Sequence, residues 1–127
     1  MEKVNKKAGL LTGLQVLDLA DEKADFCSKM LADLGACVIK VEKPGGVSSR
    51  RIGPFWKNPG HPEESLSFWY NNTNKHGITL NLESPSGRGI FRRLVINTDV
   101  VVESFSPGYL KRLGLSFEDL RGCHKIT

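Results

Sequence analysis

Three short apolar runs constrain the fold of this 127-residue chain: QVLDLA at 15–20, CVIKVE at 37–42 and DVVVESF at 99–105. Each run has the length of a β-strand and is apolar at successive positions instead of alternating ones. This pattern is typical of strands that are covered on both faces, as in parallel sheets. The segment ITLNL at 78–82 alternates and predicts a further strand.

Helical patterns lie between these runs. The helix predicted over 24–34 has one apolar face, made of Phe26, Cys27, Met30, Leu31 and Leu34. The helix predicted over 85–97 starts with the signal Ser84-Pro85, and its apolar face consists of Ile90, Phe91, Leu94 and Val95. Strands that alternate with helices form right-handed crossovers. We therefore predict an α/β fold: a Rossmann-like, mostly parallel sheet with helices on both faces and the three apolar runs at its centre.

Shorter signals follow the third apolar run. A short helix is predicted after Ser106-Pro107-Gly108, and Ser116 with Asp119 fits a capping box. The last residues, 125–127, have the pattern of a strand that is beginning. We expect residues 1–9 to form a flexible tail and residues 10–127 to form one domain.

The composition excludes several classes of protein. Hydrophobic residues make up 39% and charged residues 25%, as in an average soluble domain. No run approaches the roughly 20 apolar residues that a membrane-spanning helix needs, and the N-terminal residues MEKVNKKAG do not predict a signal peptide. The three cysteines form no C-x-x-C pair and the histidines are scattered, so we predict neither a disulfide framework nor a metal site. We expect a cytoplasmic protein with no membrane partner.

The positive charge gathers in a loop. Residues 40–60 hold five cations against a single carboxylate, Glu42: Lys40, Lys43, Arg50, Arg51 and Lys57. Such a loop fits nucleic acid, an acidic protein, a phosphorylated cofactor, or solvent alone. The helix start at Ser106-Pro107-Gly108, with Lys111 and Arg112 one turn on, is a second candidate anion site. Together the two features suit a ligand with several phosphates.

Four carboxylates cluster where the first run ends: Asp18, Asp21, Glu22 and Asp25. A general acid–base group is one interpretation. We favour the other, in which they face a helix N-terminus and solvate a loop. No glycine-rich phosphate fingerprint follows the first strand, so a dinucleotide or nucleoside-triphosphate site of the usual design is not predicted.

Four blocks resemble, in order, the N-terminal blocks of CoA-transferase family III, the CaiB/BaiF group: GLQVLDLA, MLADLGACVIKVEKPGG, NNTNKHGITLNLESPSGR and DVVVESFSPGYLKRLGLSFEDL. The resemblance runs from about Leu14 to Thr127. The group includes formyl-CoA transferase, carnitine CoA-transferase and α-methylacyl-CoA racemase. It implies a Rossmann-like large domain, an interlocked homodimer, and transfer of coenzyme A between an acyl-CoA and a carboxylic acid through a nucleophilic aspartate.

The resemblance also implies residues that contact coenzyme A. Lys43 matches a basic residue that meets the nucleotide end of the cofactor, and Phe105 matches an aromatic position. Arg112 matches an arginine that pairs with a CoA phosphate. Asn74, Lys75 and Leu80 match a further contacting block.

The family's catalytic residues would lie beyond Thr127. We therefore expect residues 10–127 to be the N-terminal CoA-binding segment of an incomplete large domain that has no catalytic residue of its own and binds CoA thioesters. A separate chain would then carry the C-terminal part, or apolar surface left around Leu17, Ile39 and Val101 would drive homo-oligomerisation. The alternative is a stand-alone CoA- or nucleotide-binding module without catalysis. A nucleic-acid partner is disfavoured because the charge lies in one loop without a recognition motif.

Overall fold

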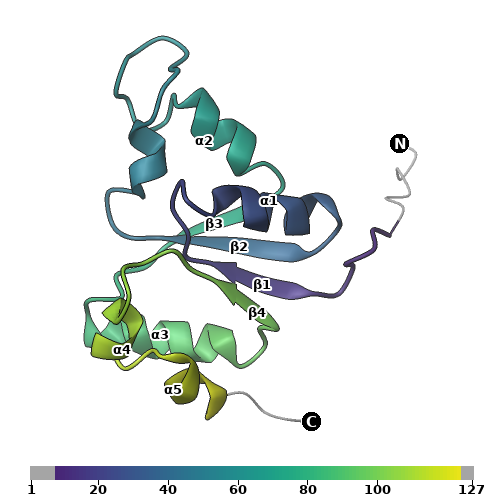
Figure 1. Ribbon diagram of the computed structural model, residues 1–127, viewed down its shortest axis with the longest axis vertical. Helices are drawn as coiled ribbons and strands as arrows, with labels where there is room; N and C mark the ends of the chain where they lie inside the picture. Colours follow the sequence, from purple (N-terminus) through teal and green to yellow (C-terminus); the bar gives the residue numbers. More distant parts are fainter. Residues whose placement is uncertain (1–7, 124–127) are drawn as a thin grey trace.

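The computed structural model describes residues 8–123 (Figure 1). Four parallel strands form its sheet, in the order β3-β2-β1-β4. They are β1 (Gln15–Asp18), β2 (Cys37–Glu42), β3 (His76–Thr79) and β4 (Val100–Val102). The predicted parallel α/β fold is confirmed. The predicted central place of 99–105 is wrong, because β4 is short and lies at the edge of the sheet within the described chain. The predicted tail at 1–9, apart from residues 8 and 9, and the strand start at 125–127 lie outside the described residues.

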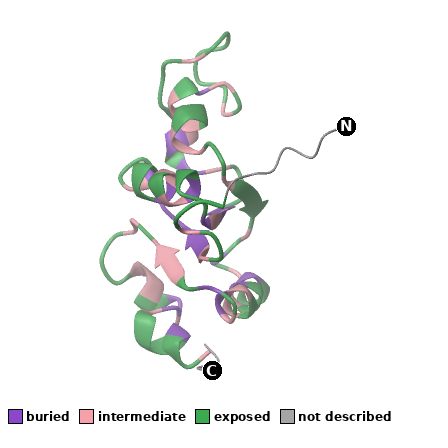
Figure 2. Cartoon of the chain, turned by 90° about the vertical axis from the view of Figure 1, so that its right-hand side faces the viewer, coloured by how far each residue is buried: buried purple, intermediate pink, exposed green. Residues whose placement is uncertain are grey.

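Helices cover both faces of the sheet, as predicted (Figure 1). Alternate residues of a strand point to opposite faces, and β1 shows the result. Val16 packs in a small core beneath α1 (Asp25–Asp33), together with Ala32 and Val38. Leu17 packs in a larger core with Phe91 of α3 (Pro85–Val95). Figure 2 shows the buried residues gathered between the layers.

Residues near the end of the described chain also pack into the larger core. The short helices α4 (Tyr109–Arg112) and α5 (Phe117–Arg121) place Leu115 and Leu120 against Phe91 and Val95. Leu17 is only 1% exposed, and Ile39 and Val101 pack against the same core. The expectation of an uncovered apolar face around these three residues is therefore wrong.

Helix α1 turns a different side to the sheet from the one predicted. Its buried residues are Asp25, Ser28 and Ala32, whereas Phe26, Met30 and Leu34 are 54%, 43% and 39% exposed. Of the predicted apolar face, Leu31 packs against the small core, whereas Phe26, Met30 and Leu34 face outward. The side against the sheet carries polar groups that meet charged partners described below.

Helix α3 follows its prediction more closely. Ser84 caps it by accepting a hydrogen bond from the Gly87 N–H, and Phe91 and Val95 are buried. Ile90, also predicted on the buried face, is largely exposed. The capping box of Ser116 and Asp119 is confirmed at the start of α5.

The segment 44–66, predicted as a basic loop, contains a 3₁₀ turn, and a helix that was not predicted follows it. A 3₁₀ turn over Ser48–Arg51 and the helix α2 (Leu66–Asn71) form an arm above the sheet (Figure 1). Arg50 ties the arm to β2 through a two-pronged ion pair with Glu42, at 2.6 and 2.7 Å. No residue of α2 is fully buried.

Candidate functional site

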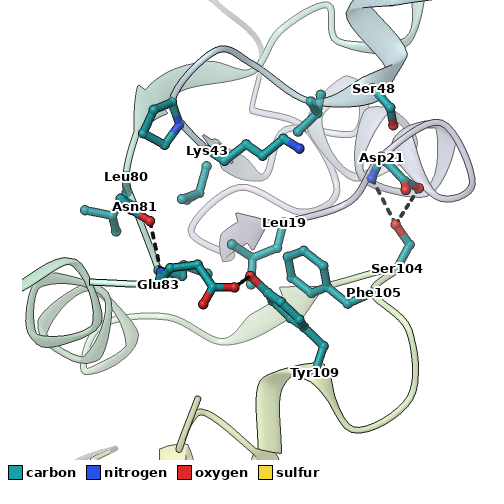
Figure 3. A pocket seen from close by; sticks show the side chains of 14 residues that line it. Leu19, Asp21, Lys43, Ser48, Leu80, Asn81, Glu83, Ser104, Phe105 and Tyr109 are labelled. Carbon is teal, nitrogen blue, oxygen red and sulfur yellow. Dashed lines mark hydrogen bonds between the residues drawn. The ribbon is translucent and has the colours of Figure 1, made fainter. Parts of the chain in front are cut away.

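A pocket of about 640 Å³ lies at the carboxyl ends of the strands (Figure 3). Every strand contributes to its wall through the residues that follow it. The lining includes Leu19 after β1, Lys43 after β2, Leu80 after β3 and Phe105 after β4. Open parallel sheets bind ligands at this end because the connecting loops meet there. The volume is in the range of cofactor sites.

One side of the pocket is apolar and aromatic. Phe105 and Tyr109 stack with ring centroids 4.5 Å apart and a tilt of 34°. Leu19 and Leu80 line the same pocket (Figure 3). A pair of aromatic rings beside aliphatic side chains offers a surface on which a flat heterocycle can stack.

Lys43 supplies positive charge to the opposite side. It follows β2 directly and is exposed, and its side chain extends along the pocket in Figure 3. No carboxylate within residues 8–123 forms an ion pair with it. Its ammonium group is therefore available to an anionic ligand.

Glu83 sits on the rim next to the aromatic pair. Its Oε1 accepts a hydrogen bond from the Tyr109 hydroxyl at 2.8 Å (Figure 3) and lies 3.4 Å from Nη2 of Arg112. The Arg112 guanidinium lies 5.2 Å from the centre of the Tyr109 ring. Burial, followed by the bond to the Glu83 carboxylate and its charge, raises the pKa of the Tyr109 hydroxyl.

The loops after β1 and β4 are joined across the pocket. The Asp21 N–H donates to Ser104 Oγ at 2.9 Å, and the Ser104 hydroxyl donates to Asp21 Oδ1 at 2.7 Å (Figure 3). Burial opposes ionisation of Asp21, but hydrogen bonds from Lys23 and Ser104 outweigh it, so the pKa of this carboxyl is lowered. These two hydrogen bonds between the loops hold one wall of the pocket in place.

The structure brings together some of the residues that the sequence indicated. Lys43, Leu80 and Phe105 line one pocket, and Arg112 reaches its rim through Glu83 and Tyr109. The other two lie elsewhere. Asn74, with a positive φ of 63°, donates to Asp33 at the end of α1, and Lys75 is buried beneath α1.

Lys75 belongs to a buried cluster of charges. Its Nζ donates to Asp18 Oδ2 at 2.8 Å and to Ser28 Oγ at 2.7 Å. Lys40 donates to Asp25 and lies 3.6 Å from Asp18. The favoured interpretation of Asp18 and Asp25 as loop-solvating residues is therefore wrong. Lys40 adds no positive charge to the basic loop, because Asp25 and Asp18 neutralise its charge inside the protein.

Sequence reasoning missed Glu83 and Tyr109 as pocket residues. Tyr109 follows Phe105 by four positions, but Phe105 lies before the start of α4, so the helical spacing rule does not predict their stacking. No local pattern predicts the pairing of Glu83 with Tyr109 and Arg112, because these partners lie 26 and 29 residues away along the chain. The second predicted anion site is weak in the structure, because α4 has four residues and no side chain caps its start.

Two features are absent from residues 8–123. Within them, no three His, Cys, Asp or Glu side chains are placed to hold a metal ion together. None of the described helices has the length and apolar character needed to cross a bilayer.

Comparison with known proteins gives concordant results. Residues 11–125 match the family model described as CoA-transferase family III. The chain is 44% identical over 106 residues to the succinyl-CoA:(R)-benzylsuccinate CoA-transferase subunit BbsE of Thauera aromatica, covering 84% of this chain and 26% of the relative. It is 38% identical over 112 residues to the succinyl-CoA–L-malate CoA-transferase beta subunit of Chloroflexus aurantiacus, covering 87% and 27%.

A solved structure agrees with these matches. A CAIB/BAIF family protein from Brucella suis superposes with a TM-score of 0.83 at 37% identity, over 93% of this chain and 32% of that one. The chain thus spans about a quarter of the length of the two curated relatives and about a third of the solved one.

Proposed function

The chain belongs to CoA-transferase family III, and on that premise we propose that its pocket binds CoA thioesters for transfer of coenzyme A between an acyl-CoA and a carboxylic acid. One observation carries the proposal. Lys43, Leu80 and Phe105, which the family resemblance indicated as contacts for coenzyme A, follow three different strands and line a single pocket. A scatter of these residues over the surface would have given the proposal no support.

The chemistry of the lining suits the nucleotide end of coenzyme A. The cofactor presents a purine ring and several phosphates, so it needs a stacking surface and cations. Phe105 and Tyr109 offer the surface, and Lys43 and Arg112 offer charge for phosphate oxygens. Leu80 adds apolar contact beside the rings.

We assign positioning, and no nucleophilic role, to the four carboxylates Asp18, Asp21, Asp25 and Glu83. Asp18 and Asp25 are buried and paired with lysines. Asp21 is held by Ser104 and Lys23, and Glu83 by Tyr109. A nucleophilic carboxylate must approach the thioester carbonyl freely, and these four are already engaged.

Calorimetric titration of the chain with coenzyme A tests the proposal. We expect saturable binding that weakens about five- to tenfold in Lys43→Ala, as for loss of one charge-assisted contact, and similarly in Phe105→Ala, through loss of stacking. Lys57→Ala and Phe117→Ala are matched controls, because both side chains are exposed outside the pocket. Absence of binding, or equal losses in the controls, would contradict the proposal.

A further inference from the structure

Glu83 places a negative charge beside the groups that an anionic ligand would seek. Its carboxylate lines the pocket, accepts a hydrogen bond from Tyr109 and pairs with Arg112. The Glu83 and Arg112 side chains remain 53% and 63% exposed. A ligand in the pocket can therefore reach both of them without any rearrangement of the core.

The same carboxylate arranges the aromatic wall. The hydrogen bond from Tyr109 to Glu83 fixes the phenol ring that stacks on Phe105. The Arg112 guanidinium lies over the same Tyr109 ring. Glu83 therefore pairs with the Arg112 guanidinium and accepts from the Tyr109 hydroxyl at the same time. Both are donors that a phosphate oxygen would otherwise accept from.

We propose that Glu83 is a built-in competitor for anions: it pairs with Arg112 at the rim of the pocket and thereby lowers the affinity for phosphate groups. The inference rests on the proposed function, since it concerns how the same pocket discriminates among phosphorylated ligands. A phosphate that binds Arg112 must break the ion pair between Arg112 and Glu83, and its charge then lies near the Glu83 carboxylate. Glu83 is thus a specificity-determining residue that opposes ligands with more negative charge at this rim.

The size of the effect follows from the exposure of the pair. An exposed ion pair at 3.4 Å is weak and exchanges readily. A like charge several ångströms from a bound phosphate in water adds a repulsion of similar size. Removing the charge of Glu83 should therefore strengthen phosphate binding by about three- to tenfold, and salt should reduce the gain.

The test compares the wild type with Glu83→Gln, which keeps the size of the side chain and an oxygen that can accept from Tyr109. Each is titrated with coenzyme A and, separately, with inorganic pyrophosphate at low and high salt. Glu118→Gln is the matched control, because Glu118 is exposed on α5 outside the pocket. We expect tighter binding of both probes only in Glu83→Gln, with a gain that shrinks at high salt.

The two probes separate this inference from the proposed function. If neither protein binds coenzyme A, the proposed function fails, and pyrophosphate alone decides the role of Glu83. The inference is overturned if Glu83→Gln binds pyrophosphate no more tightly than the wild type, or if Glu118→Gln gains equally. A spectrophotometric titration of the tyrosines checks the contact itself, since the pKa of Tyr109 should fall when the Glu83 charge is removed.

Discussion

Lys75 joins three segments of the chain through one ammonium group. Asp18 at the end of β1, Ser28 within α1 and Asn72 after α2 all have an oxygen within 2.8 Å of its Nζ. Burial lowers the pKa of Lys75, while the hydrogen bond and charge of Asp18 act in the opposite direction. The group is therefore costly to bury alone and depends on its partners.

Replacing this lysine should destabilise the fold strongly. Lys75→Met keeps much of the apolar stem but leaves Asp18 with one cation fewer, and removal of one partner from a buried pair costs about 3–5 kcal/mol. Lys23→Met is the matched control, because Lys23 pairs with Asp21 while its own side chain is 64% exposed; the control should change the stability far less than Lys75→Met. Urea unfolding measures both, and equal losses would refute the structural role of the cluster.

Glu42 should make the stability of the folded protein depend on pH in the acidic range. Burial opposes ionisation of this carboxyl, but the Arg50 hydrogen bonds, the Val47 N–H and the Arg50 charge outweigh it, so the pKa of Glu42 lies below its ordinary value of 4.5. A lowered pKa in the folded state means that the pair contributes its full stability above the unfolded value. That contribution is lost as the pH falls through the folded value.

Glu42→Gln should remove this dependence. We expect it to cost about 1.5–3 kcal/mol at neutral pH, the range for hydrogen bonds to a charged group. Between pH 5 and pH 3, as the carboxyl becomes protonated in the wild type, the difference between the two proteins should shrink. Glu118→Gln, on the exposed surface of α5, is the control for replacing a glutamate by glutamine. Denaturant midpoints across this pH range provide the measurement, and parallel curves for wild type and Glu42→Gln would contradict the assignment.

The charged cluster also marks where prediction from sequence ended. The apolar runs identified the strands, because their pattern depends on neighbouring residues alone. The partners of Asp18 are Lys40 and Lys75, 22 and 57 positions along the chain, and no local pattern connects them. Lys43, Leu80 and Phe105 could be placed in a pocket only through the family resemblance and the rule that loops meet at one end of a parallel sheet.

At the scale of the elements, α1 shows how an apolar stripe can mislead. The period of Phe26, Met30 and Leu34 correctly predicted a helix, but the rule that the apolar side faces the core failed. Asp25 and Ser28 take the inner side because Asp18, Lys40 and Lys75 provide buried polar partners there. The helix was predictable, whereas its orientation depended on contacts between distant segments.

Helix α3 contains two glycines that differ in the space around them. A Cβ on Gly87 would lie 1.8 Å from the backbone oxygen of Asn81, whereas one on Gly89 would meet nothing within 4 Å. Gly87→Ala should therefore displace the start of α3 and cost about 1–3 kcal/mol or more. Gly89→Ala should stabilise the same helix by about 0.5–1 kcal/mol, because alanine loses less backbone entropy. Thermal unfolding compares the pair directly; a stabilising Gly87→Ala would show that the loop before α3 is not packed as described.

At the scale of the whole molecule, one group of exposed apolar side chains lies on α1 and α2. Phe26, Met30 and Leu34 form a stripe along α1, and Trp69 and Tyr70 are exposed on the neighbouring α2. The two helices are in contact, since the Lys29 ammonium lies 5.0 Å from the centre of the Tyr70 ring. Apolar surface of this kind on one side of a protein is typical of an interaction face.

We expect this face to associate with a second copy of the chain at micromolar concentration, since a stable interface needs about 800 Å² from each partner and these two helices offer the apolar side chains for it. The double variant Phe26→Gln, Met30→Gln should shift the protein towards the monomer, because it places amides where apolar contact would form. Ile90→Gln is the matched control, as Ile90 is similarly exposed on α3, across the sheet. Sedimentation velocity over a concentration series measures the shift. A wild type that stays monomeric throughout, or a control that dissociates as readily as the double variant, would rule out α1 as the contact surface.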